Sequence, residues 1–187
     1  MRVIAGSARG TRLVRPPAGV RPVADRAREG LFSSLGDRVR DARVADLFAG
    51  TGALGIEALS RGAEGAVFVD RNPQAVAVVR ENLARTRLGE RASVVRSDVR
   101  RFLERPAGDG FDLVFLDPPY DAGVGDVLAL LSEESLLRGG ATVVLTRGRR
   151  SSNDVIPVHW LVARRLSYGD SVVTLFRSRD LPRTTEV

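Results

Sequence analysis

The 187-residue sequence has no cysteine, no lysine and a single histidine, His159. The absence of cysteine excludes disulfides, thiolate metal sites and a thiol nucleophile, and one histidine is too few for a histidine-based metal site. No apolar run approaches the about 20 residues that a membrane span needs, and no secretory signal opens the chain. We therefore expect a cytoplasmic protein that uses no metal and contacts no membrane.

Without lysine, the positive charge rests on 29 arginines, which exceed the 23 acidic residues by six. The excess is confined to residues 1–28, where seven arginines are offset by Asp25 alone. A local basic segment indicates an anionic partner, although a disordered, solvated tail can have the same composition. The alternating stretches RVIAG and TRLVR, joined by SARG, favour a short β-hairpin over such a tail.

Most of the remaining chain alternates between two patterns. Strand-like apolar runs at 43–48, 66–70, 92–96, 111–116 and 141–146 are separated by helical patterns at 53–61, 73–86, 99–105 and 124–135. This alternation predicts an α/β protein with βαβ units, a largely parallel sheet and helices on both faces. Two more strand-like runs around Tyr168-Gly169-Asp170 predict a closing antiparallel hairpin.

A glycine-rich loop lies where the first predicted strand meets the first following helix. Within DLFAGTGALG, residues 46–55, the glycines Gly50, Gly52 and Gly55 match G-x-G-x-x-G, and Asp70 ends the next strand. The glycines allow a ligand to approach bare backbone, and an acid at the position of Asp70 can bind ribose hydroxyls. This combination is typical of nucleotide cofactors and does not by itself separate NAD from S-adenosylmethionine.

Two further acids favour S-adenosylmethionine. Asp46 precedes the glycines, where it would repel a pyrophosphate but attract the ammonium of a methionine moiety. Asp98 follows the third strand, where it can accept a hydrogen bond from adenine, although an acid there is also a common helix N-cap. A dehydrogenase is disfavoured because it needs a proton-transfer group and the lone His159 lies in an unpromising context.

Asp117-Pro118-Pro119-Tyr120 follows the fourth strand, at the same edge of the sheet as the glycine loop. An exocyclic amino group of a base is a poor nucleophile because its lone pair is delocalised into the ring. The Asp117 carboxylate and the Pro118 carbonyl can accept its two N–H groups and localise that lone pair, while Tyr120 can stack on the base. Methylation at a pyrimidine ring carbon needs a thiol adduct, which this chain cannot form. A plain turn is the alternative for this motif.

These motifs, DLFAGTG, VD at 69–70, SDV and DPPY, resemble those of class I S-adenosylmethionine-dependent amino-methyltransferases. The opening stretch RVIAGSARGTRLVRPPAGVRPVADRAREGLFSSL is similar to one family of that class, the bacterial 16S rRNA guanine-N2 methyltransferases of the RsmD family. The resemblance implies a Rossmann-like, seven-stranded, mostly parallel sheet with an antiparallel last strand. It implies S-adenosylmethionine as the cofactor. The implied target is N2 of a guanine in the head of the small subunit near the P site, in 30S subunits or late assembly particles.

Carried over residue by residue, the resemblance assigns three sets of residues. The cofactor set is Asp46, Phe48, Ala49, Gly50, Thr51, Gly52, Asp70, Arg71, Asp98 and Val99. The catalytic set is Asp117, Pro118, Pro119 and Tyr120, and the set expected to bind RNA phosphates is Arg2, Arg9, Arg12, Arg15, Arg21 and Arg28. One departure is Val23, where the family usually has threonine, so any contact of that hydroxyl is lost.

We therefore expect residues 1–20 to form an arginine-rich RNA-binding extension and residues 21–187 a monomeric methyltransferase domain. Three other functions compete with this one. A DNA adenine-N6 or cytosine-N4 methyltransferase would need a separate target-recognition domain, for which the chain has no room. A protein-glutamine methyltransferase more often has asparagine in place of Asp117. A non-catalytic RNA-binding assembly factor would have no need for the acids at 46, 70, 98 and 117.

Overall fold

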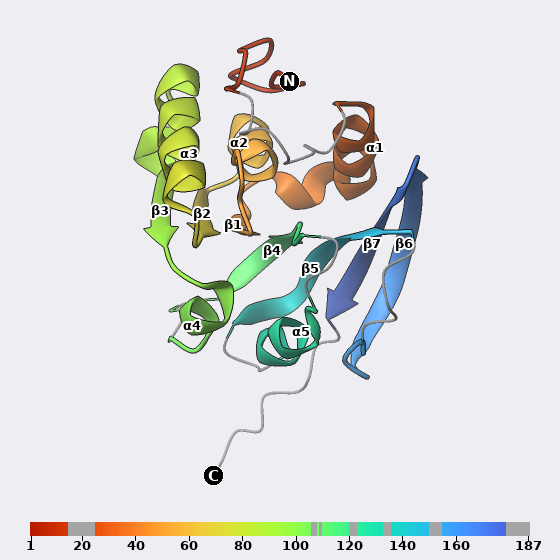
Figure 1. The fold of residues 1–187 in the computed structure, drawn as a ribbon. Helices are drawn as coiled ribbons and strands as arrows, with labels where there is room; N and C mark the ends of the chain where they lie inside the picture. Colours follow the sequence, from red (N-terminus) through yellow and green to blue (C-terminus); the bar gives the residue numbers. More distant parts are fainter. Residues whose placement is uncertain are drawn as a thin grey trace.

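The computed structural model describes residues 1–14, 25–105, 108, 110–119, 123–132, 136–149 and 155–178. Its centre is a seven-stranded sheet in the order β3-β2-β1-β4-β5-β7-β6 (Figure 1). The strands are β1 (Arg43–Leu47), β2 (Gly65–Asp70), β3 (Ala92–Arg96), β4 (Phe111–Leu116), β5 (Leu137–Gly148), β6 (Trp160–Tyr168) and β7 (Ser171–Ser178). Strands β1 to β5 pair in parallel, and β7 runs antiparallel to both of its neighbours. This confirms the predicted mostly parallel α/β sheet with a reversed last strand.

Helices cover both faces of the sheet, as predicted (Figure 1). One apolar cluster joins β-strand residues such as Phe68 and Phe115 to the first three helices, and a second joins residues such as Val114 and Leu116 to the other two. Because neighbouring residues of a strand point to opposite faces, each strand contributes to both clusters. The helices are α1 (Asp25–Leu35), α2 (Ala53–Ser60), α3 (Pro73–Thr86), α4 (Val99–Leu103) and α5 (Gly125–Leu131), with short 3₁₀ turns at Gly36–Val39 and Gly89–Arg91. Within the described part of the chain, no helix has the length and apolarity required to cross a membrane.

The register of the central strands decides where functional loops meet. Leu47 at the end of β1 is level with Val69 in β2 and with Leu116 at the end of β4. The chain therefore leaves three adjacent parallel strands at one level, and the loops that follow them lie side by side. This edge, at the carboxyl ends of the strands, is where ligands bind in open α/β sheets.

Residues 1–14 form a minimal hairpin. Its two arms meet at a single antiparallel bridge between Arg2 and Arg12, supported by a 3.0 Å hydrogen bond from Val3 N–H to the Thr11 carbonyl. Val3, Ala8 and Leu13 are buried in the same cluster as α2 and α3, whereas Arg2, Arg9 and Arg12 are exposed. The described first part of the arginine-rich segment, residues 1–14, is thus packed against the apolar cluster on one face of the sheet. The expected domain boundary at residue 20 lies outside the described residues.

Candidate active site

The glycine loop after β1 adopts a backbone that requires glycine. The φ angles of Gly50 and Gly52 are 56° and 73°, in the left-handed region that residues with a Cβ rarely adopt. A Cβ on Gly52 would lie 3.2 Å from the Phe68 ring, and one on Gly55 would lie 2.4 Å from it. The first two glycines therefore shape the loop, and Gly55 lets α2 approach β2 closely. Phe48 also has a positive φ of 62°, which costs about 1–3 kcal/mol and is typical of functional loops.

Asp70 joins the glycine loop to the end of β2. The backbone N–H of Gly50 donates to its Oδ2 at 2.9 Å, and that of Asn72 donates to its Oδ1 at 2.8 Å. A carboxylate has about four lone-pair sites, so the partly buried Asp70 keeps acceptor capacity for the ribose hydroxyls assigned to it. Arg71, next along the chain, is exposed.

Asp46 is a buried acid beneath the glycine loop. Only 2% of its surface is exposed, and its Oδ2 accepts a 2.9 Å hydrogen bond from Gly55 N–H. Burial raises the pKa of Asp46 to about 8, although the Gly55 hydrogen bond opposes the shift, and repulsion from Asp117 and Asp70 adds to it. Much of the desolvation penalty would be recovered if a cation bound beside the carboxylate. The site thus fits the cationic methionine end of S-adenosylmethionine.

Asp98 caps α4. Its Oδ1 accepts from Arg100 N–H at 3.0 Å, and its extended backbone is typical of an N-cap. The following Val99 is buried in the cluster that covers the second face of the sheet. The N-cap that the sequence left as an alternative for Asp98 is therefore present. It uses one of the two carboxylate oxygens, so the assigned contact with adenine stays a prediction.

Asp117 comes directly after β4 and extends the ladder with β1, since its N–H faces the Leu47 carbonyl at 3.5 Å. Burial raises the pKa of Asp117 to about 6, and a hydrogen bond from the Thr146 side chain of β5 opposes the shift. Pro118 is buried and Pro119 is exposed, while Tyr120 lies outside the described residues. The repulsion between Asp117 and Asp46 indicates that the acceptor expected for the target base lies near the acid expected for the cofactor.

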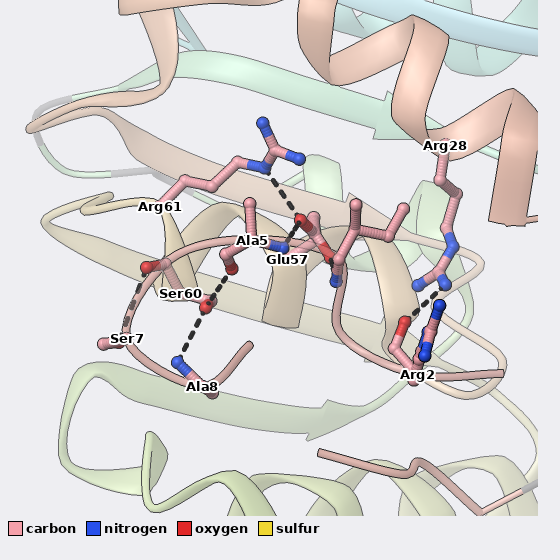
Figure 2. A network of polar contacts seen from close by, with 9 residues as sticks. Arg2, Ala5, Ser7, Ala8, Arg28, Glu57, Ser60 and Arg61 are labelled. Carbon is pink, nitrogen blue, oxygen red and sulfur yellow. Dashed lines mark hydrogen bonds and ion pairs between the residues drawn. The ribbon is translucent and has the colours of Figure 1, made fainter. Parts of the chain in front are cut away.

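The structure corrects the role expected of Arg28. Its side chain is 0% exposed, and its Nη2 donates to Asp25 Oδ1 at 2.7 Å. The same Nη2 donates to the Arg2 carbonyl at 2.7 Å (Figure 2). Arg28 lies on the inner side of α1, among the buried positions of that helix. It therefore ties α1 to the hairpin and is not available to RNA phosphates. Arg15, Arg21 and Val23 lie outside the described residues.

Sequence reasoning missed four buried polar residues. Thr146 supports Asp117, and the other three are buried side chains that hold the hairpin: Glu57, Ser60 and Asn82. A signal for Glu57 was available, because it is the only charged residue in the helix ALGIEALS, whose other residues apart from Ser60 are apolar. A charge in such a context indicates a buried partner, but nothing in the local sequence says which.

The strand order, the reversed seventh strand and the glycine loop flanked by acids at three strand ends together define a class I methyltransferase, the class whose cofactor is S-adenosylmethionine. The chain belongs to the family described as Conserved hypothetical protein 95, whose sequence model matches residues 1–177. This is the RsmD family that the opening stretch resembles.

Individual relatives agree with this assignment. The chain is 37% identical over 184 residues to YlbH of Bacillus subtilis, provisionally named as an rRNA methyltransferase, which covers 96% of this chain and 100% of that protein. It is 34% identical over 179 residues to ribosomal RNA small subunit methyltransferase D of Escherichia coli K12, covering 95% of this chain and 89% of that protein. Among solved structures, yhhF of Escherichia coli, provisionally named as a methyltransferase, superimposes with a TM-score of 0.86 at 32% identity, covering 97% and 99% of the two chains.

A more distant neighbour shares the fold. An RNA methyltransferase of Salinibacter ruber, solved in complex with S-adenosyl-L-homocysteine, superimposes with a TM-score of 0.66 at 16% identity and covers 87% of this chain and 97% of that one.

Proposed function

We propose that this protein methylates the exocyclic N2 of a guanine in 16S rRNA, in the small-subunit head near the P site. The substrate would be the 30S subunit or a late assembly particle, and the enzyme would act as a monomer. The observation that carries the proposal is the position and pKa of Asp117, a partly buried acid beside the glycine-loop edge of a class I methyltransferase. The names of the relatives support rRNA as the substrate class.

The proposed cofactor site uses the residues assigned from the sequence. Asp46 would bind the ammonium, Asp70 the ribose, Asp98 the adenine, and the loop from Phe48 to Gly52 would supply bare backbone. The remaining members, Arg71 and Val99, adjoin two of these acids. S-adenosylmethionine supplies an electrophilic methyl group when it is bound. The protein itself must position the nucleophile and accept the proton that the nucleophile loses.

In this proposal Asp117 and the Pro118 carbonyl accept the two N–H groups of the guanine amine. Both hydrogen bonds favour a more tetrahedral nitrogen, whose lone pair is localised and can attack. Pro118 suits this role because its ring fixes φ and stiffens the backbone that directs the carbonyl. Pro119 would continue that rigid turn, and Tyr120 would stack on the base.

The raised pKa of Asp117 supports its second role. With a pKa of about 6, the carboxylate is mostly ionised at neutral pH and can accept the amine N–H. Transfer of the methyl group turns the amine into a strongly acidic cation, which must lose a proton. A base whose pKa lies near the working pH is suited to take that proton, so Asp117 would receive it from the methylated nitrogen.

Arg2, Arg9 and Arg12 would contact the rRNA backbone. They lie on one hairpin, and all three are exposed. Among the described residues none of the three forms an ion pair with an acid, so each can bind a phosphate without first breaking a protein contact. Arg15 and Arg21 remain in the proposal on the strength of the sequence.

The test is transfer of tritiated methyl groups to 30S particles, naked 16S rRNA, double-stranded DNA and protein, followed by nucleoside analysis of the labelled product. The expected product is N2-methylguanosine from the ribosomal substrates only. Asp117→Ala should keep cofactor affinity and lose about 100-fold or more of turnover. Label in DNA or in glutamine would instead support the corresponding rival. No label in any substrate would support an assembly factor.

A further inference from the structure

A fully buried carboxylate holds the backbone of the hairpin. Glu57 of α2 is 0% exposed. Its Oε2 accepts the N–H of Ile4 at 2.8 Å, and its Oε1 accepts the N–H of Ala5 at 3.0 Å and Nε of Arg61 at 2.7 Å (Figure 2). Two successive backbone N–H groups directed at one anion form a concave anion site. Burial of a charge is costly unless it is paired and hydrogen-bonded, and these three bonds satisfy both conditions.

A second contact follows one turn later on α2. The Ser60 hydroxyl donates to the Ala5 carbonyl at 2.6 Å and accepts from Ala8 N–H at 3.0 Å, and the Ser60 carbonyl accepts Ser7 N–H at 2.8 Å. The fit is close, because a Cβ on Gly6, whose φ is +84°, would lie 1.8 Å from the Ser60 carbonyl oxygen. Ser60 at the end of α2 therefore holds the hairpin turn by hydrogen bonds to the backbone of the turn.

A third contact connects the hairpin to the glycine loop. Asn82 of α3 is fully buried, accepts from Val14 N–H at 2.7 Å and donates to the Thr51 carbonyl at 2.9 Å. Helix α2 itself begins directly after Gly52. Of the two helices that hold the hairpin, α2 therefore follows the glycine loop directly and α3 is hydrogen-bonded to it.

These contacts do not involve the arginine side chains of the hairpin. The side chains of Glu57, Ser60 and Asn82 form their hydrogen bonds to the hairpin with its backbone groups, while the side chains of Arg2, Arg9 and Arg12 are exposed. The hairpin backbone that carries the arginines is therefore held in a fixed position relative to the glycine loop.

We propose that Glu57 is a positioning residue for RNA recognition. It fixes the hairpin on α2 so that the exposed arginines contact the rRNA backbone while the target base reaches Asp117. This inference rests on the proposed function, because it assumes that RNA is the substrate.

The test compares Glu57→Gln with Glu81→Gln. Glutamine keeps the size of the side chain but directs an NH₂ group at one of the two backbone N–H groups and removes the charge that pairs with Arg61. Glu81 forms an exposed pair with Arg85 at the same i,i+4 spacing, and it has no hydrogen bond or ion pair with residues 1–14. The affinity for 30S particles is measured at several salt concentrations, together with KM for the particle, the Kd for S-adenosylhomocysteine and the hydrogen exchange of the Ile4 and Ala5 amides.

For Glu57→Gln we expect faster exchange at both amides, a roughly 10-fold higher KM for the particle, and a shallower salt dependence of binding because phosphate contacts are lost. The cofactor Kd should stay within about twofold of wild type, and Glu81→Gln should match wild type throughout. If Glu57→Gln does not fold, Ser60→Ala, which removes only the hydroxyl contacts, should show the same pattern.

Three results would overturn the inference. The first is unchanged RNA affinity and salt dependence in a folded variant with fast-exchanging amides, which would leave Glu57 a purely structural role. The second is a parallel loss of cofactor affinity. The third is a wild-type protein that does not bind 30S particles, which would also rule out the proposed substrate. The first two results contradict the inference alone, whereas the third contradicts the proposed function as well.

Discussion

The ionisation of Asp46 makes cofactor binding depend on pH in a way that can be calculated. With a pKa of about 8, Asp46 is about one tenth ionised at pH 7 and about one hundredth ionised at pH 6. If the ionised carboxylate binds the ligand's ammonium, the protein must lose a proton before or during binding. The affinity for S-adenosylhomocysteine should then rise about tenfold per pH unit, or roughly 20- to 30-fold between pH 6.0 and 7.5, which corresponds to about 1.8–2 kcal/mol.

Isothermal titration calorimetry measures both parts of this prediction. Titrations at pH 6.0, 6.5, 7.0 and 7.5 give the affinity, and two buffers of different ionisation enthalpy give the number of protons released, which should be close to one at pH 6.5. The window ends at pH 7.5 so that the ligand's ammonium stays mostly protonated.

Asp46→Asn is the matched variant, because its amide oxygen can still accept the Gly55 N–H that Asp46 accepts. The variant should bind more weakly at pH 7.5 and show little dependence on pH. An affinity that stays flat in the wild-type protein, with no proton released, would refute the assignment of Asp46 to a cationic group.

Three other properties follow from the structure. Turnover on 30S particles should rise with pH through about 6 and level off above 7, because Asp117 must be ionised to accept the amine; a flat profile would contradict its role as the acceptor. Gly55→Ala should lower the free energy of unfolding by about 1–3 kcal/mol through overpacking against Phe68, measured by urea denaturation, whereas Gly89→Ala, with nothing within 4 Å of its Cβ, should change it little. Replacing the three exposed hairpin arginines with glutamine should reduce the slope of log affinity for 30S particles against log salt by about 2–3 without changing cofactor affinity; an unchanged slope would remove the hairpin from the RNA interface.

The fold was predictable because its signals are local. Continuous apolar runs bounded by glycine and aspartate are typical of buried parallel strands, and β1, β2, β3 and β4 lie within a residue of their predicted ranges. The prediction failed at β5, which begins at Leu137 instead of residue 141. Arg138-Gly139-Gly140 favours a turn in the sequence, yet the strand continues through it with a positive φ at Gly140 and a register shift opposite β4.

The site was predictable in part for a similar reason. The glycine loop and Asp117 are recognisable from a few neighbouring residues. Arg28 was misassigned because an arginine in a basic segment suggests exposure, and its burial depends on contacts that α1 makes with the hairpin. The role of Glu57 was hidden because its hydrogen-bond partners lie 52 and 53 residues earlier in the chain.

The dependence of the hairpin on distant side chains also affects the order of folding. Residues 1–14 are synthesised before α2 and α3 exist, yet the backbone N–H groups of Ile4, Ala5 and Val14 lack their acceptors until Glu57 and Asn82 have been made. Contacts of such long sequence separation form late because the intervening chain must first be ordered. A segment made early in translation should therefore be among the last to fold, and the hairpin would reach its final position only after α2 and α3 have formed.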